Sequence, residues 1–150
     1  MHKPRGFTMV ELMIAVVLMG IIMAIGAPKL GAIRDRASVR SATQQIGAYV
    51  ATTRAAAIRR GMRANFKMAA DTMWIEIQQP GAPEVIAPRI PLSETFNVNV
   101  TGPPDSIVFD SRGFAIYPSV TSKFVVSRAS ARDSTCVTRL GMVSPKCKLY

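Results

Sequence analysis

The order of apolar and polar residues divides the chain into three parts. From Phe7 to Pro28 the residues are almost all apolar, and the one charged side chain among them is Glu11. An apolar run of this length can cross a bilayer as a helix. No small-residue cleavage site of the kind that ends an ordinary secretory signal follows it, so we expect the run to be retained in the membrane.

The second part, residues 29–61, is amphipathic. The residues of one helical face recur at intervals of three and four. They are Leu30, Ile33, Ala37, Ile46, Tyr49, Val50, Thr53 and Ala57. Arginines lie mostly off this face, which is typical of a solvated helix surface, and Gly61 is typical of a helix end. The two parts together predict one continuous helix from about Thr8 to Arg60.

The third part, residues 62–150, alternates short β-type segments with turn residues. The predicted strands are residues 65–69, 73–78, 84–87, 95–100, 107–109, 114–117, 123–127 and 136–140. The alternation of Phe96, Val98 and Val100 predicts a strand with one face buried against the helix. The fold class is therefore α+β, with a long N-terminal α-helix packed on a mainly antiparallel β-sheet head.

The composition shows an excess of positive charge and few of the residues that catalytic or metal sites use. Lys and Arg number 19 against 9 Asp and Glu, which favours anionic partners. The sole histidine, His2, lies at the very start, the acids are scattered, and no phosphate-binding loop or zinc-ligand spacing is present. We expect neither an enzyme nor a metal or cofactor site.

Cys136 and Cys147 are the two cysteines of the chain. Their spacing is unlike the C-x-x-C spacing of redox pairs. If the head faces an oxidising compartment, the two residues are expected to form a structural disulfide.

The start of the chain carries a specific motif. Residues 1–6 contain Lys3 and Arg5 and no acid, and the string that follows is Gly6-Phe7-Thr8-Met9-Val10-Glu11-Leu12. It closely resembles the class III leader of type IV pilins and type II secretion pseudopilins. The resemblance implies that residues 1–6 are a leader peptide and that residues 7–28 are a transmembrane assembly helix.

The same resemblance assigns roles to single residues. A prepilin peptidase would cut between Gly6 and Phe7, and the new N-terminal Phe7 would be N-methylated. Glu11 would pair with the α-amino group of Phe7 in a neighbouring subunit, which offsets the desolvation of both charges. Pro28 would kink the helix. The alternative for Glu11 is that it lies at the membrane interface and reaches water.

A second, looser resemblance covers the head. Residues 109–114, 125–127 and 138–141 look like the strand and turn pattern of minor pilins and pseudopilins of the GspH/FimT type. It implies a non-catalytic structural subunit that helps initiate, cap or build a type IV pilus or a type II secretion pseudopilus. Its partners would be prepilin peptidase/methylase, other pilins or pseudopilins, and the inner membrane, with the head in the periplasm.

Two alternatives remain open. Some minor pilins of this type bind DNA through a basic C-terminal region, and the corresponding residues here are Arg128, Arg132, Arg139, Lys146 and Lys148. The cationic surface would bind phosphates without reading bases. The other alternative is a single-pass membrane protein with no role in a filament.

Overall fold

The computed structural model describes residues 6–103, 106–117, 121–144 and 147. It contains two compact units, Met1–Arg34 and Asp35–Tyr150, and we call the second unit the head. The first helix, α1, runs over Met9–Arg60 and ends at Gly61, whose φ is 62°. The continuous helix predicted from the sequence is confirmed.

Within the head, α1 buries one stripe of side chains. Val39, Ala42, Ile46, Val50 and Ala57 are at most 2% exposed, and they follow one another at helical spacing. Ala37, predicted to belong to this stripe, is exposed. Leu30 and Ile33, the first two predicted members, are exposed as well, so the buried face of α1 begins only at Val39.

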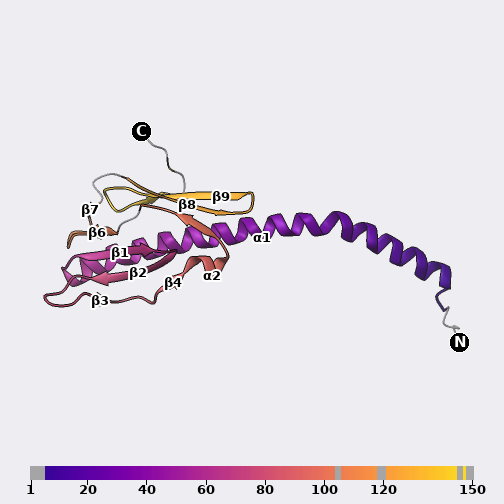
Figure 1. Ribbon diagram of the computed structural model, residues 1–150, viewed down its shortest axis with the longest axis horizontal. Coiled ribbons are helices and arrows are strands. Elements are labelled where there is room, and N and C mark those ends of the chain that lie inside the picture. The colour runs from indigo at the N-terminus through magenta and orange to yellow at the C-terminus, as the bar shows by residue number, and fades with distance from the viewer. Residues whose placement is uncertain (1–5, 104–105, 118–120, 145–146, 148–150) are drawn as a thin grey trace, which may run out of the picture. The chain divides into compact units, whose positions relative to one another are not determined.

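In the residues that the structure describes, ten strands and a second helix follow α1, and the strand pairs are all antiparallel. The first sheet has the order β3-β2-β1-β6-β7, with β4 also paired to β2 (Figure 1). Its strands are β1 Ala64–Ala69, β2 Thr72–Ile77, β3 Glu84–Val85, β4 Ile90–Pro91, β6 Ile107–Phe109 and β7 Ala115–Tyr117.

The second sheet has the order β10-β9-β8-β5. Its strands are β5 Asn99–Thr101, β8 Ser122–Arg128, β9 Ala131–Val137 and β10 Val143–Ser144. Phe66 of the first sheet and Phe124 of the second meet edge to face, with ring centroids 5.8 Å apart. Both rings are fully buried, so this aromatic pair joins the two sheets in one core.

The strand predicted over residues 95–100 is wrong in its first half. Helix α2, Leu92–Phe96, occupies this stretch and ends at Asn97, whose φ is 52°. Asparagine tolerates a left-handed backbone and ends the helix there, so β5 starts only at Asn99. The alternation of Phe96, Val98 and Val100 thus spans a helix end, a connection and a strand.

The strand predicted over residues 136–140 is shifted: the observed strand, β9, runs over Ala131–Val137. β9 pairs with β8 along its whole length, from Arg128 opposite Ala131 to Ser122 opposite Val137. The hairpin needs only Ala129 and Ser130 as its turn, so β9 begins directly after them. Residues 138–141 instead form a turn, in which the N–H of Gly141 donates to the carbonyl of Thr138.

Candidate functional site

Thr8 and Glu11 close a capping box at the start of α1. The backbone N–H of Thr8 donates to Glu11 Oε2 at 2.8 Å, and the Thr8 hydroxyl donates to the same oxygen at 3.0 Å. In return, the backbone N–H of Glu11 donates to Thr8 Oγ1 at 3.2 Å. These bonds satisfy N–H groups that a first helical turn leaves without partners. Sequence reasoning missed this cap, although Thr-x-x-Glu is its signature.

Gly6 and Phe7 lie in the non-helical residues directly before this cap. Both are exposed, and the side chain of Phe7 is 89% exposed. The Gly6–Phe7 peptide bond is therefore outside any regular hydrogen-bonded structure. A protease can bind such a segment as an extended chain without first unwinding a helix.

Behind the cap, α1 has the length and composition of a membrane-crossing helix. Its most apolar window has a mean hydropathy of 2.5, and none of that window is buried. The side chains from Val10 to Ile25 that are large and apolar are all more than half exposed. The helix continues through Pro28. The kink assigned to this residue stays a prediction.

Arg128, one of the candidate DNA-binding residues, is engaged inside the head. Its Nε lies 2.8 Å from Asp35 Oδ1. Its Nη1 donates to Ser38 Oγ at 2.9 Å and to the Phe96 carbonyl at 3.2 Å. One guanidinium thus ties β8 to α1 and to the end of α2, which is a structural role.

Two of the other candidate basic residues, Arg132 and Arg139, lie in the described part of the chain. Arg132 and Arg139 are exposed but line separate grooves. Arg132 is the second residue of β9 and Arg139 follows its end, so roughly 20 Å of chain separates them. Lys146 and Lys148 lie outside the described residues. The described part of the predicted set is therefore not brought together.

A tight turn follows β6 and contains Asp110. One carboxylate oxygen of Asp110 accepts the backbone N–H of Phe114 at 2.8 Å and that of Arg112 at 3.0 Å. The bond from the Phe114 N–H is the main reason that the pKa of Asp110 lies below its ordinary value, with Arg112 adding to it at 3.1 Å. The turn closes at Gly113, whose φ is 83°.

Two of the three head segments that carry the looser resemblance, residues 109–114 and 138–141, meet in space. A Cβ on Gly141 would lie 3.1 Å from the Gly113 carbonyl oxygen and 2.8 Å from the Phe109 ring. Beside them, the backbone N–H of Ala115 donates to the carbonyl of Arg139 at 3.0 Å. The two glycine turns are thus packed against each other.

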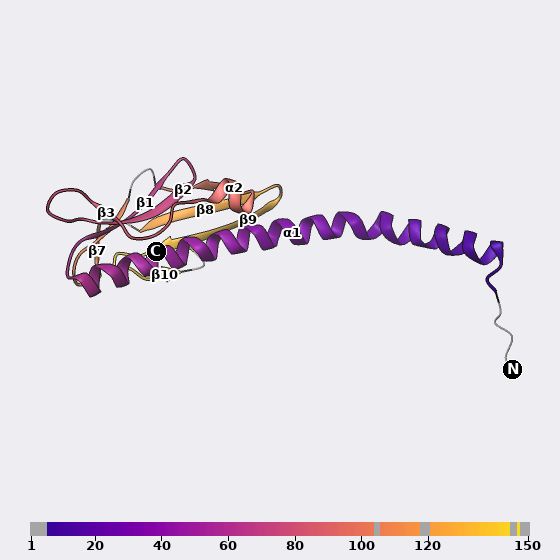
Figure 2. The ribbon, with the colours of Figure 1, turned by 90° about the horizontal axis from the view of Figure 1, so that it is seen from below.

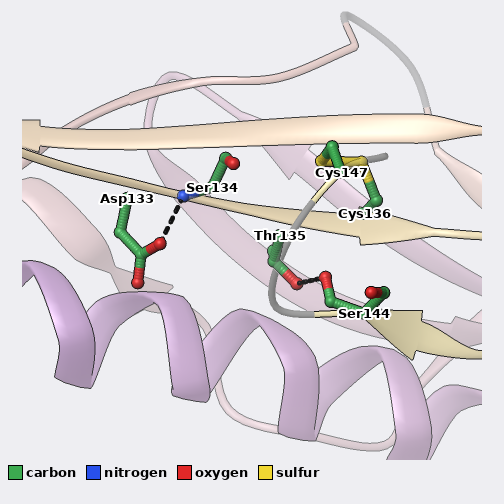
Figure 3. Close-up of a disulfide and its surroundings, with 6 residues drawn as sticks. All are labelled: Asp133, Ser134, Thr135, Cys136, Ser144 and Cys147. Atoms are coloured by element: carbon green, nitrogen blue, oxygen red, sulfur yellow. Dashed lines mark hydrogen bonds between the residues drawn. A yellow bond between two sulfur atoms is a disulfide. The ribbon is translucent and has the colours of Figure 1, made fainter. Parts of the chain in front are cut away.

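The disulfide joins Cys136 of β9 to Cys147, with Cα atoms 5.4 Å apart (Figure 3). Between these residues, Ser144 of β10 lies opposite Cys136 in the sheet, and its carbonyl accepts the Thr135 hydroxyl at 3.4 Å. The bridge therefore fastens the chain after β10 back onto the second sheet.

In the described part of the chain, no group of three His, Cys, Asp or Glu side chains is placed to hold a metal ion. The features of the structure that bear on function are the capped apolar helix and, separately, the exposed faces of the head.

Comparisons with known proteins agree with this description. Residues 1–27 match the prokaryotic N-terminal methylation motif, and residues 42–141 match the type II transport protein GspH. No curated protein matches the sequence.

Two crystal structures of the type IV minor pilin FimU from Pseudomonas aeruginosa are similar to the chain. The first has a TM-score of 0.60 at 12% identity and covers 77% of this chain and 92% of that one. The second has a TM-score of 0.55 at 12% identity and covers 72% and 92%. At this identity the likeness concerns the fold, and it confirms the predicted α+β class.

Proposed function

Since this chain belongs to the family of the type II transport protein GspH, we propose that it is a minor pilin or pseudopilin. In this proposal it is a non-catalytic subunit that helps initiate, cap or build a type IV pilus or a type II secretion pseudopilus. Prepilin peptidase removes residues 1–6 and the new N-terminal Phe7 is methylated. The apolar helix anchors the subunit in the inner membrane, with the head in the periplasm.

One observation carries the proposal: the Gly6–Phe7 bond directly precedes a capping box at the N-terminus of an exposed apolar helix. The helix starts at Met9, so cleavage after Gly6 leaves the cap and every helical hydrogen bond in place. The mature N-terminus then lies one residue from Thr8. Processing changes the charge at the helix start without unfolding it.

Glu11 supports the assembly role through its charge. A carboxylate in an apolar span is costly unless it is paired. Both bonds that Thr8 donates fall on Glu11 Oε2, which leaves Oε1 for a donor from another subunit. The α-amino group of a neighbouring Phe7 is such a donor, and it brings the opposite charge. Contacts of this head-to-tail kind propagate into a fibre.

The experiment is to express the full chain in cells with and without prepilin peptidase and to measure the mass of the purified product. With the peptidase, we expect loss of residues 1–6 and addition of one methyl group at Phe7. Gly6→Val, which adds bulk beside the scissile bond, should leave the chain uncut. Gly31→Val is the matched control because that glycine is also exposed and unpacked.

Retention of residues 1–6 in peptidase-containing cells would contradict the proposal. So would a processed subunit that never co-purifies with filament or pseudopilus components. The first result would favour a simple single-pass membrane protein, and the second would separate processing from assembly.

A further inference from the structure

Three arginines converge on one groove of the head, which we call the arginine groove. It lies between α1 and the turn of the β8–β9 hairpin and has a volume of about 380 Å³. Arg36 and Arg40 come from successive turns of α1, four residues apart on one helix face, and Arg132 comes from β9. In both ribbon views this hairpin runs beside the head part of α1 (Figure 1, Figure 2).

The positive charge of this groove is not balanced from within. Among the described residues, the ion pairs of the head involve Arg60, Lys67, Arg112 and Arg128, and none involves an arginine of the groove. The nearby Asp35 carboxylate is taken by Arg128. Within the described part of the chain, the acid that lines the groove is Asp133, whose carboxylate is turned toward α1 and accepts the Ser134 N–H at 2.8 Å (Figure 3).

Three like charges around one hollow repel one another, and one carboxylate compensates only part of that repulsion. A bound anion would remove the rest. Guanidinium groups suit phosphate and carboxylate groups, because their planar N–H donors match two oxygens at once. The arrangement therefore indicates an anionic ligand, and a phosphate group is one that fits it.

The chain itself keeps this groove near a membrane. Only residues 29–35 separate Arg36 from the end of the apolar run at Pro28, which is at most about 28 Å of chain. This limit holds for any arrangement of the two units. Phospholipid phosphates at the membrane surface lie within that reach and are present at high local concentration.

We propose that the arginine groove binds the phosphate of an anionic phospholipid in the membrane that anchors the same chain. The inference rests on the membrane anchoring of the proposed function and not on entry into a filament. It gives the unassembled subunit a lipid contact, which must be released when the subunit leaves the bilayer.

The test uses the purified full chain in detergent micelles and native mass spectrometry, with palmitoyl-oleoyl phosphatidylglycerol or phosphatidylcholine added. The wild type should bind phosphatidylglycerol more tightly. Replacing Arg36, Arg40 and Arg132 by Gln should weaken that binding by roughly fivefold per arginine, the contribution usual for a basic residue near an anionic lipid surface.

The matched control replaces Arg59, Arg63 and Arg139 by Gln, which removes the same charge from exposed positions outside the groove. It should keep nearly wild-type affinity. Equal binding of the two lipids by the wild type would overturn the proposal, and so would an equal loss in both triple variants.

Asp133→Asn is a second variant whose expected effect is a gain, which misfolding could not produce. The amide oxygen can still accept the Ser134 N–H, while the repelling charge is gone. Phosphatidylglycerol should bind a few-fold more tightly, and unchanged or weaker binding would count against the groove.

Two competitors identify the source of the phosphate. Inorganic phosphate that displaces the lipid at equal concentration would make this a site for a free anion. Duplex DNA that binds more tightly than the lipid at equal phosphate concentration, and less tightly to the groove variant, would make it a nucleic-acid site. Either result overturns the lipid assignment. None of these substitutions or competitors should affect cleavage after Gly6. A negative result in the lipid-binding experiments can therefore be distinguished from failure of the proposed function.

Discussion

The backbone N–H of Thr8 donates to the Glu11 carboxylate at 2.8 Å, so the residue proposed to pair between subunits also caps its own helix. The two roles use different properties of the side chain. Capping needs an acceptor at the third helical position, which Gln also supplies, whereas pairing with an α-amino group needs the negative charge.

Two substitutions of Glu11 should therefore separate these roles. Glu11→Gln should keep the helix start and membrane insertion but lose filament incorporation and reduce methylation, because only the charge is removed. Glu11→Ala should lose the cap as well and fray the first turn. Incorporation is measured by co-purification with the filament, and helix fraying by hydrogen exchange at residues 8–12.

Normal incorporation of Glu11→Gln would show that the charge is not needed. Thr8→Ser is the control, since serine keeps both the hydroxyl acceptor and the backbone donor of the capping box. It should behave as the wild type in both measurements.

Arg128 should contribute to stability and not to ligand binding. Arg128→Gln removes the ion pair with Asp35 and the bond to the Phe96 carbonyl, and we expect the free energy of unfolding to fall by about 1–2 kcal/mol. Urea unfolding of the full chain in micelles, followed by the fluorescence of Trp74, measures this. If Asp35→Asn adds its full effect on top of Arg128→Gln, the two residues are not coupled. Arg132→Gln should change stability little.

The N-terminal half was predictable because its signals are local. The apolar run, the Gly6-Phe7 motif and the stop at Gly61 each lie within a few residues, and α1 follows them closely. The head was harder because its contacts join distant segments. Nothing beside Arg128 in the sequence points to Asp35 as its partner. The family resemblance and the positive charge of Arg128 placed it among the candidate DNA-binding residues.

The same distinction explains the errors in the strands. An alternating pattern such as Phe96, Val98 and Val100 records burial, and burial also arises where a short helix packs on a sheet. The start of β9 depended on a two-residue turn at Ala129 and Ser130, which lacks the usual Asn-Gly or Asp-Gly signal. The capping box of Thr8 and Glu11 is a local signal, and its Thr-x-x-Glu sequence is sufficient to predict it.

Because of the turn at Asp110, the stability of the head should depend on pH in the acidic range. The hydrogen bond from the Phe114 N–H favours the carboxylate, so the pKa of Asp110 is lower in the folded chain than its ordinary value of 3.8. The ionised Asp110 side chain therefore contributes its full stabilisation above its ordinary pKa. That stabilisation is lost as the pH falls through the lower pKa that Asp110 has in the folded chain. Asp110→Asn should flatten this part of the pH profile. Parallel wild-type and variant profiles below pH 3.8 in urea unfolding would contradict the assignment.

The Cys136–Cys147 disulfide closes a loop with a sequence separation of 11 residues. In the chain-entropy model, a loop of this size stabilises a fold by about 3 kcal/mol. Cys136→Ser with Cys147→Ser should lower the free energy of unfolding by up to this amount. Mass spectrometry of the unreduced chain checks the pairing itself, and two free thiols in protein purified without reductant would refute it.

Replacing Gly141 should destabilise the head. Its φ of 71° strains any other residue, and a Cβ there would lie 2.8 Å from the Phe109 ring and 3.1 Å from the Gly113 carbonyl oxygen. Gly141→Ala must therefore separate the two turns or displace a fully buried phenylalanine, and we expect a loss of about 2–4 kcal/mol in urea unfolding.

Gly81→Ala is the matched control, because its φ of 112° is also strained but nothing lies within 4 Å of the added carbon. The control should lose only the backbone term of about 1–2 kcal/mol. Equal losses in the two variants would mean that the contact between the Gly113 and Gly141 turns contributes nothing to the stability of the head.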